Sequence, residues 1–190
     1  MTYSVKEIFY TLQGEGGNAG RAAVFCRFSG CNLWSGLEKH RSDAICKFCD
    51  TDFVGTDGIN GGKYTTSNDL SNKIESTWSG QESRLVVFTG GEPGLQIKEE
   101  LVAELQARNF EVAIETNGTV SIPKNIDWVC VSPKASTKLL VTKGDELKLV
   151  FPQEGVNPNN FIGLDFTHFF LQPLDDANLT KNSQMAVEYC

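Results

Sequence analysis

The sequence predicts an α/β fold built mainly from parallel strands. Short apolar runs, such as Leu85 to Phe88 and Val112 to Ile114, alternate with segments of helix or loop length. This alternation is typical of parallel α/β architectures. The chain has 190 residues, 40% of them hydrophobic, which suffices for one domain with a complete core. We therefore expect a single domain over residues 1–190.

The first half of the chain predicts a strand, a long loop and a helix, in that order. Residues 22–28 alternate loosely between apolar and polar and predict a strand. Residues 31–63 are polar and glycine-rich without a regular period, and loops of this length in compact domains are usually functional or disordered. We expect them to form an inserted loop. Thr66 and Ser67 are suitable N-caps for a helix over about 68–78.

The second half repeats strands that end in polar or glycine-containing signatures. Ile97, Leu101 and Leu105 share one helical face between two of these strands. In parallel α/β folds the carboxyl ends of the strands meet at one edge, where ligands bind. Strand termination explains any one signature, but five of them favour a ligand site. The runs and their signatures are 85–88 with TGGEP, 112–114 with ETNG, 128–131 with SPK, 147–151 with PQ, and 169–171 with QPLD.

Composition and charge exclude several classes of function. The net charge is −7 and no long Lys or Arg run exists, which argues against non-specific binding to nucleic acid. The amino-terminal sequence has no signal-peptide pattern, and no apolar run is long enough to cross a bilayer. We expect a cytoplasmic protein whose thiols are reduced, so its six cysteines are not expected to form disulfides.

Three cysteines, Cys31, Cys46 and Cys49, lie in the long loop with the spacing C-x14-C-x2-C. Three thiolates can hold a 4Fe-4S cluster and leave one iron open to an outside ligand, as chemistry on a bound cofactor requires. Together with His40, the same cysteines could instead form a closed, structural Cys3His zinc site. The loop alone does not separate these two alternatives.

The TGGEP signature at residues 89–93 favours the iron–sulfur alternative. Its adjacent glycines allow the backbone to approach a ligand closely, because no Cβ stands in the way. Its exposed carbonyl groups and the Glu92 carboxylate suit an ammonium group, whereas the Walker pattern of a phosphate-binding loop is absent. A ligand with a free amino group is therefore expected beside the cysteine loop.

Further motifs accompany the cysteine loop and TGGEP. They are FYTLQGEG at residues 9–16, FCR at 25–27, ETNG at 115–118, SPK at 132–134 and QPLD at 172–175. Together they resemble the radical S-adenosylmethionine enzymes and, among these, the 7-carboxy-7-deazaguanine synthases, over most of the chain. The usual motif of these enzymes is C-x3-C-x2-C. The first gap is longer in this chain, as it is in one branch of these synthases. The resemblance implies an incomplete (β/α) barrel of the radical enzyme type with its site on the carboxyl rim, and a homodimer.

The resemblance also implies the cofactors and their residues. Cys31, Cys46 and Cys49 would bind a 4Fe-4S cluster and be catalytic through it. Thr51 matches the magnesium ligand of the family, although a capping hydroxyl is the simpler interpretation of this residue by itself. S-adenosylmethionine would meet Gly91 and Glu92 with its ammonium, Ser132, Pro133 and Lys134 around its carboxylate, and Phe48, Cys49, Asp50, Asn117, Gln172, Pro173, Leu174 and Asp175 with its ribose and adenine.

The implied substrate is 6-carboxy-5,6,7,8-tetrahydropterin. Backbone and amide groups near residue 13 would meet its pterin edge. Arg27 lies inside a strand-like run, so it is either a solvent-facing strand residue or a fork for the substrate carboxylate. The residues expected at the substrate are Leu12, Gln13, Gly14, Glu15, Arg27 and Thr89.

The implied reaction is a radical ring contraction that a carbon–nitrogen lyase would catalyse. A donor such as flavodoxin or ferredoxin would supply one electron, a 5′-deoxyadenosyl radical would take hydrogen from the pterin, and loss of ammonia would give 7-carboxy-7-deazaguanine for queuosine and related 7-deazapurines. Family members continue beyond the equivalent of residues 184–190 with a tail that helps to hold substrate. Two alternatives stay open: a glycyl-radical activating enzyme, against which residues 12–16 and Arg27 argue, and a zinc-stabilised interaction module.

Overall fold

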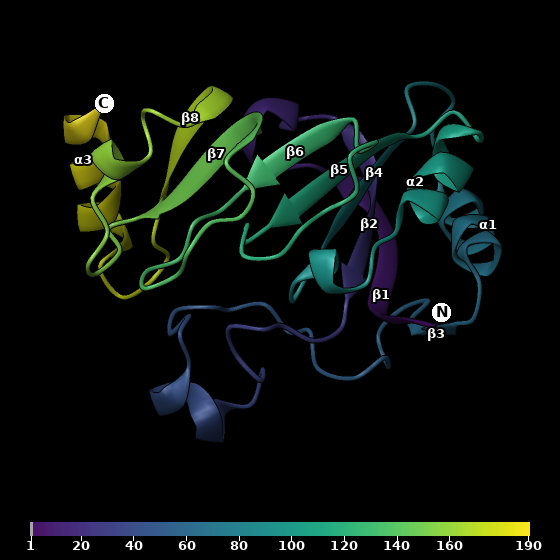
Figure 1. Ribbon diagram of the computed structural model, residues 1–190, viewed down its shortest axis with the longest axis horizontal. Coiled ribbons are helices and arrows are strands. Elements are labelled where there is room, and N and C mark those ends of the chain that lie inside the picture. The colour runs from purple at the N-terminus through teal and green to yellow at the C-terminus, as the bar shows by residue number, and fades with distance from the viewer. Residues whose placement is uncertain (1) are drawn as a thin grey trace.

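An eight-stranded mixed sheet organises residues 2–190, the part of the chain that the computed structural model describes. The strands are β1 (Tyr3–Leu12), β2 (Ala22–Phe28), β3 (Gly62–Tyr64), β4 (Leu85–Gly90), β5 (Glu111–Thr116), β6 (Trp128–Val131), β7 (Lys143–Phe151) and β8 (Asp165–Pro173). Their order across the sheet is β3-β1-β2-β4-β5-β6-β7-β8 (Figure 1). The strands from β2 onward in this order run parallel, whereas β1 and β3 run antiparallel to their neighbours. The sheet does not close, so the predicted incomplete barrel with mainly parallel strands is confirmed.

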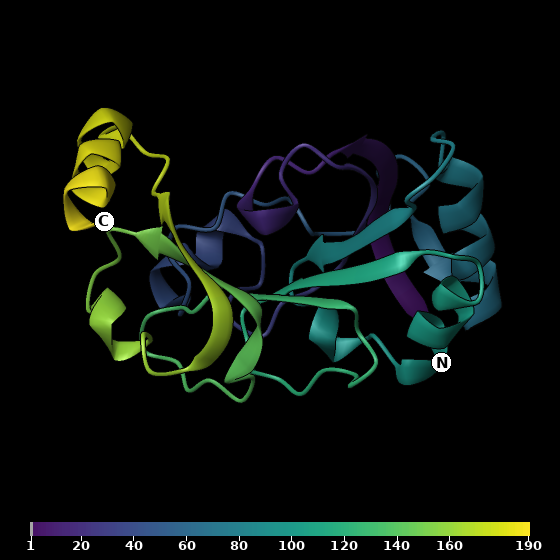
Figure 2. The same ribbon diagram turned by 90° about the horizontal axis from the view of Figure 1, so that it is seen from above.

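Three α-helices lie at the two ends of this sheet: α1 (Ser67–Thr77), α2 (Glu99–Gln106) and α3 (Leu179–Tyr189). Helices α1 and α2 lie beside the β1 and β2 end of the sheet, and α3 lies beside β8 (Figures 1 and 2). The predicted helix after residue 66 is confirmed. Its N-cap is Thr66, whose side chain accepts a hydrogen bond from the Asp69 amide in a reciprocal capping box, and Ser67 is already the first helical residue.

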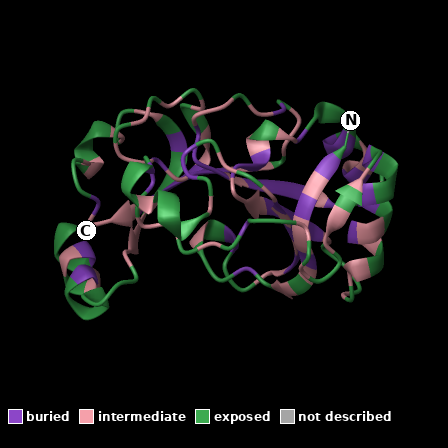
Figure 3. Cartoon of the chain, turned by 90° about the horizontal axis from the view of Figure 1, so that it is seen from below, coloured by how far each residue is buried: buried purple, intermediate pink, exposed green. Residues whose placement is uncertain are grey.

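Helices α1 and α2 cover one face of the sheet and leave the opposite face to a ligand site. Leu70 of α1 and Leu101 of α2 pack in one apolar cluster with Val24, Val86 and Val112, which lie on three neighbouring strands. On the opposite face, Ala23, Leu85, Val87 and Ala113 form a smaller apolar cluster. Buried residues concentrate on the strands and exposed residues on the surrounding loops (Figure 3). We call this opposite face the inner face of the sheet.

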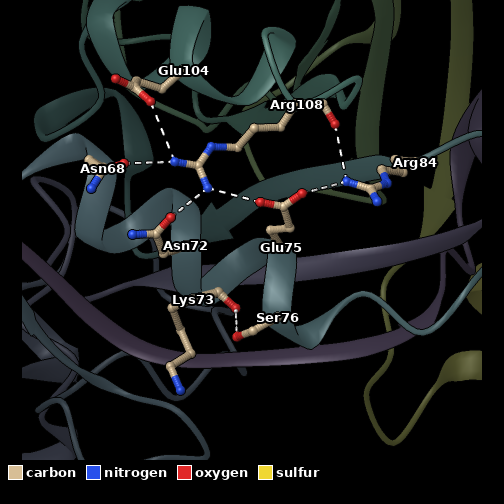
Figure 4. Close-up of polar contacts among 8 residues, drawn as sticks. All are labelled: Asn68, Asn72, Lys73, Glu75, Ser76, Arg84, Glu104 and Arg108. Carbon is tan, nitrogen blue, oxygen red and sulfur yellow. Dashed lines mark hydrogen bonds and ion pairs between the residues drawn. The ribbon is translucent and has the colours of Figure 1, made fainter.

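Arg108, just after α2, fixes the two covering helices to each other. Its Nη1 atom donates to Asn72 Oδ1 at 2.7 Å and to Glu75 Oε2 at 3.0 Å, and its Nη2 atom donates to Asn68 Oδ1 at 2.8 Å. Glu75 also accepts from Arg84 Nη1 at 2.8 Å, so a single carboxylate joins two arginines (Figure 4). These contacts hold α1 and α2 on the face of the sheet opposite the inner face, which we call the outer face.

Three elements were absent from the prediction. Strand β1 lies at residues where period-two alternation is broken by a register shift between Val5 and Glu7, so buried Tyr3, Val5 and Ile8 do not follow one phase. Strand β3 begins inside the segment predicted as a loop, and α3 follows the last predicted strand. The predicted strands at 22–28, 85–88, 112–114, 128–131, 147–151 and 169–171 are all present, the last two with longer amino-terminal ends. Within the described chain, every helix is too short or too polar to traverse a lipid bilayer.

Candidate active site

A cavity of about 570 Å³ opens where the parallel strands meet the cysteine loop, and its volume is typical of a ligand site. Its lining includes residues of the TGGEP, ETNG, SPK and QPLD signatures, which confirms that four of the five predicted signatures meet at one edge. The PQ signature does not line it. Gln153 is instead buried and accepts a hydrogen bond from the Ala135 amide at 2.6 Å, so it supports the SPK loop from behind.

Most residues predicted for the site line this one cavity, although their individual roles stay predictions. The exceptions are Glu92 and Pro133, which are buried and do not line it. The predicted residues that line it are Leu12, Gln13, Gly14, Glu15, Arg27, Cys31, Cys46, Phe48, Cys49, Asp50, Thr51, Thr89, Gly91, Asn117, Ser132, Lys134, Gln172, Pro173, Leu174 and Asp175.

The three loop cysteines are free thiols that face the cavity together. A hydrogen bond from the Cys46 thiol lowers the pKa of Cys49 to about 6, and backbone and side-chain hydrogen bonds from Thr51 act in the same direction. The same bond raises the pKa of Cys46. A thiolate is the form that binds iron, so Cys49 is the member of this trio whose surroundings favour the metal-binding form.

An aromatic wall backs the cysteines. Trp34 and Phe53 are buried and meet edge to face with ring centroids 5.6 Å apart, and Cys31 and Cys49 pack against this cluster. Burial raises the pKa of the Cys31 thiol. An apolar shell of this kind controls solvent access to a metal cluster, so the surroundings suit an iron–sulfur cube.

The alternative of a closed zinc site fits this geometry less well. His40 is exposed, and its Nδ1 atom hydrogen-bonds with Ser35 Oγ at 2.9 Å. Among residues 2–190, no group of three or more His, Cys, Asp or Glu side chains gathers around one point as a single metal ion requires. A 4Fe-4S cube needs only three thiolates from the loop. Because His40 bonds to Ser35 at the surface, the three thiols match the cube better than a closed Cys3His zinc site.

Glu92 joins two of the rim signatures from behind the cavity wall. Its Oε1 atom accepts hydrogen bonds from Thr116 Oγ1 at 2.7 Å and from the Gly94 amide at 2.8 Å, and its Oε2 atom accepts one from the Asn117 amide at 2.7 Å. The residue has 0% exposure, and burial raises its pKa despite these donors. The carboxylate thus fixes TGGEP against ETNG, and the expected contact with the S-adenosylmethionine ammonium stays a prediction.

Lys134 supplies a positive charge beside the cysteine loop. Its Nζ atom donates to Ser132 Oγ at 2.6 Å and to the Ser132 carbonyl at 2.9 Å, and it lies 5.8 Å from the centre of the Phe48 ring. Burial lowers the pKa of Lys134, and the nearby Cys46 and Cys49 oppose that shift. An ammonium group held in this way suits a carboxylate ligand.

Two charged residues of the cavity were not predicted as site residues. Lys148 on β7 is 5% exposed, and Glu115 on β5 belongs to the ETNG motif without a predicted role. A lysine between Leu147 and Leu149 is unusual in a buried strand, and this signal in the sequence could have identified Lys148. The other unpredicted lining residues are Phe9, Thr11, Phe25, Leu33, Trp34, Phe53, Gly90, Thr116 and Val150.

Comparison with known proteins places this site in a family. The 7-carboxy-7-deazaguanine synthases of Caulobacter vibrioides and Burkholderia multivorans are 61% and 56% identical to the chain over 191 aligned positions, which cover all of the chain and 91% of each relative. The crystal structure of QueE from Escherichia coli matches with a TM-score of 0.75 and 26% identity over 100% of the chain and 90% of that structure. No protein-family model matches the chain.

The parallel sheet and the three thiols at its carboxyl edge, with these likenesses, define a radical S-adenosylmethionine enzyme, a class that carries a 4Fe-4S cluster. The chain belongs to the 7-carboxy-7-deazaguanine synthase family, lyases of queuosine biosynthesis. The resemblance found in the sequence is thereby confirmed.

Proposed function

We propose that the protein converts 6-carboxy-5,6,7,8-tetrahydropterin to 7-carboxy-7-deazaguanine with loss of ammonia. The observation that carries the proposal is a single cavity lined both by the three cluster thiols and by Arg27, Thr89 and Glu15. A cofactor and a polar, anionic substrate can therefore meet in one cavity. Relatives with the synthase name at 54% identity or more support the same reaction.

When bound, the cluster and S-adenosylmethionine supply the radical chemistry, and the protein binds, orients and excludes water. Lys134 with Ser132 would hold the cofactor carboxylate, because its ammonium already lies at the cluster loop. The carbonyl groups around Gly91 would receive the cofactor ammonium. The ribose and adenine would lie between Phe48, Asp50, Asn117 and the segment from Gln172 to Asp175, all of which line the cavity.

The proposal extends to a metal ion, a donor and an assembly. Thr51 lies two residues after the last cluster cysteine and lines the cavity, so its hydroxyl would serve a Mg²⁺ ion that braces the substrate carboxylate. A flavodoxin or ferredoxin would deliver the electron in the cytoplasm, where thiols stay reduced. A homodimer would cover the edge strand β8, which exposes Phe169 and Phe170.

Replacing Arg27 with Ala is expected to lower kcat/KM for the carboxypterin by about 10- to 150-fold, the worth of a charged hydrogen bond. Arg27 faces the cavity, and its Nε atom donates to Glu7 Oε1 at 2.7 Å. Within residues 2–190 no hydrogen bond occupies its Nη atoms, so a carboxylate can meet them. Arg27→Lys is expected to restore little, because lysine lacks the planar fork.

Steady-state kinetics under anaerobic conditions measure this effect, with reductive cleavage of S-adenosylmethionine in the absence of pterin as the second readout. That cleavage is expected to persist, because the residues proposed for the cofactor lie on other segments. Arg84→Ala is the matched control, since Arg84 bonds to Glu75 on the outer face. Unchanged pterin turnover in Arg27→Ala would remove Arg27 from the substrate site.

The test of the function itself is an anaerobic incubation of cluster-loaded, reduced protein with S-adenosylmethionine and the carboxypterin. The expected products are 7-carboxy-7-deazaguanine, identified by mass, and an equal amount of ammonia. If S-adenosylmethionine is cleaved and the pterin stays intact, the substrate assignment is wrong. A partner protein that acquires a backbone radical in that case would establish the glycyl-radical activating alternative.

A further inference from the structure

A buried lysine links two carboxylates in the cavity. Lys148 Nζ lies 2.6 Å from Glu15 Oε2 and 3.5 Å from Glu115 Oε2. Gln13 completes the group, because its Nε2 atom donates to Glu115 Oε1 at 2.8 Å and its Oε1 atom accepts from the Glu15 amide at 3.3 Å. All four residues line the cavity, although they come from β7, β5 and the segment after β1. We call this set the lysine-centred group.

The lysine-centred group has more acceptors than donors. Two carboxylates face one ammonium, and each carboxylate oxygen can accept two hydrogen bonds. Within residues 2–190, Glu15 Oε1 accepts no hydrogen bond, and the one partner of Glu115 Oε2 is Lys148 Nζ at 3.5 Å. The carboxylates raise the pKa of Lys148 against the effect of burial, so its ammonium stays charged. The group is therefore net negative and open to further N–H donors.

Neighbouring contacts do not satisfy these acceptors. Glu146, two residues before Lys148 on β7, accepts the Gly17 amide at 2.7 Å and so holds the segment after β1 in place. The other cationic residues that line the cavity are Arg27, which pairs with Glu7, and Lys134, which donates to Ser132. The open acceptors thus remain available to a ligand.

The lysine-centred group and Arg27 lie on the same inner face of the sheet and carry opposite net charges. Arg27 of β2 pairs with Thr89 of β4 in the parallel register, and Glu115 follows Ile114, the partner of Phe88, on the next strand. A cation and an acceptor group therefore lie two strands apart on one surface. A ligand with a carboxylate at one end and N–H donors at the other end would bind here in only one orientation.

We propose that Lys148 is a positioning residue that holds Glu15 and Glu115 as acceptors for an amino group and adjacent ring N–H of an aminopyrimidinone ring. The proposal rests on the proposed function, because the substrate named there carries such a ring. It adds Glu115 as a specificity-determining residue and gives Lys148 a role through the carboxylates that it orients. An anionic group is excluded from this end of the cavity by the net negative charge.

Two ring-edge analogues test this proposal by binding alone. Calorimetry compares 6-carboxypterin with 6-carboxylumazine, which has a carbonyl in place of the amino group, on cluster-loaded protein with S-adenosylmethionine. The unaltered protein is expected to bind the pterin at least about tenfold more tightly. The carbonyl oxygen of the lumazine would face a carboxylate, and neither group can donate a hydrogen bond to the other. In Glu115→Gln this preference is expected to fall to about threefold or less, since an amide is no longer a charged acceptor.

Lys148 is tested with the same ratio. Lys148→Met is expected to lose most of the preference, because two unpaired carboxylates no longer stay side by side, and Lys148→Arg is expected to recover part of it. Lys63→Met is the matched control, because Lys63 is exposed on β3, and it is expected to keep the unaltered ratio. If Lys148→Met does not fold, the nearly isosteric Glu115→Gln still decides the proposal.

The outcomes separate this inference from the proposed function. An unaltered protein without a preference, or Glu115→Gln with the full preference, overturns the inference even if the enzyme makes 7-carboxy-7-deazaguanine. A preference that Glu115→Gln removes supports the inference, whether or not turnover of the tetrahydropterin is seen. Failed turnover in the product assay counts against the proposed function alone.

Discussion

Replacing Cys31, Cys46 or Cys49 singly with Ala is expected to abolish reductive cleavage of S-adenosylmethionine. Each thiolate would hold one iron of the cluster, and the remaining cysteines cannot replace it, because Cys26 and Cys130 are buried inside the sheet. The loss should exceed the roughly 10- to 100-fold that follows removal of a residue hydrogen-bonded to a metal ligand. Iron and sulfide content, visible absorbance and 5′-deoxyadenosine formation measure the effect.

The control for these variants is Cys190→Ala, because Cys190 is an exposed free thiol outside the cavity lining. It is expected to keep both the cluster and the cleavage activity. Cleavage at the unaltered rate in all three loop variants would refute the cluster assignment. A colourless protein with one stoichiometric zinc ion would instead establish the Cys3His alternative.

The cysteine loop and the rim signatures could be predicted because they are local in the sequence. A strand followed by glycine or a polar motif shows where a parallel strand ends, and parallel strands end at one edge. The cavity lining bears this out for four of the five signatures. No long-range information was needed for this part of the site.

The contacts within the lysine-centred group could not be predicted, because they join distant segments of the chain. Lys148 meets Glu15 across 133 positions of the sequence, and Gln13 meets Glu115 across 102. Only the strand order and register place these residues together. The contacts of Glu92 could not be predicted either. The sequence shows an acidic residue after two glycines, but its hydrogen bonds to Thr116 and Asn117 follow from the pairing of β4 with β5.

The glycines of TGGEP have a role that their sequence suggested only in part. A close approach to a ligand was expected, but the structure shows a close approach between two segments of the chain. The Gly91 amide donates to the Phe28 carbonyl at 3.1 Å, and the Glu92 amide donates to the Gly30 carbonyl at 2.9 Å. TGGEP is therefore hydrogen-bonded to the backbone just before the first cluster cysteine, so a shift of one motif moves the other.

Gly91→Ala is expected to reduce cluster content and to slow S-adenosylmethionine cleavage by about 100-fold, because displacement of a reacting group by about 1 Å costs that much in rate. A Cβ atom on Gly91 would overlap the Gly30 carbonyl oxygen and would lie 3.0 Å from the Cys31 amide nitrogen. The obstacle is backbone on both sides, which cannot rotate away as a side chain would. The loop must therefore shift, and Cys31 shifts with it.

Iron content and 5′-deoxyadenosine formation measure this change, and the thermal midpoint reports on global folding. Gly163→Ala is the matched control, since a Cβ there meets nothing within 4 Å and its backbone is not in the left-handed region. A Gly91→Ala protein with full cluster content and full cleavage would contradict the argument. A variant could instead lose the cluster but keep a thermal midpoint near that of the metal-free unaltered protein. This result would show that the contact between Gly91 and Gly30 acts locally on Cys31, because general unfolding would lower both the cluster content and the thermal midpoint.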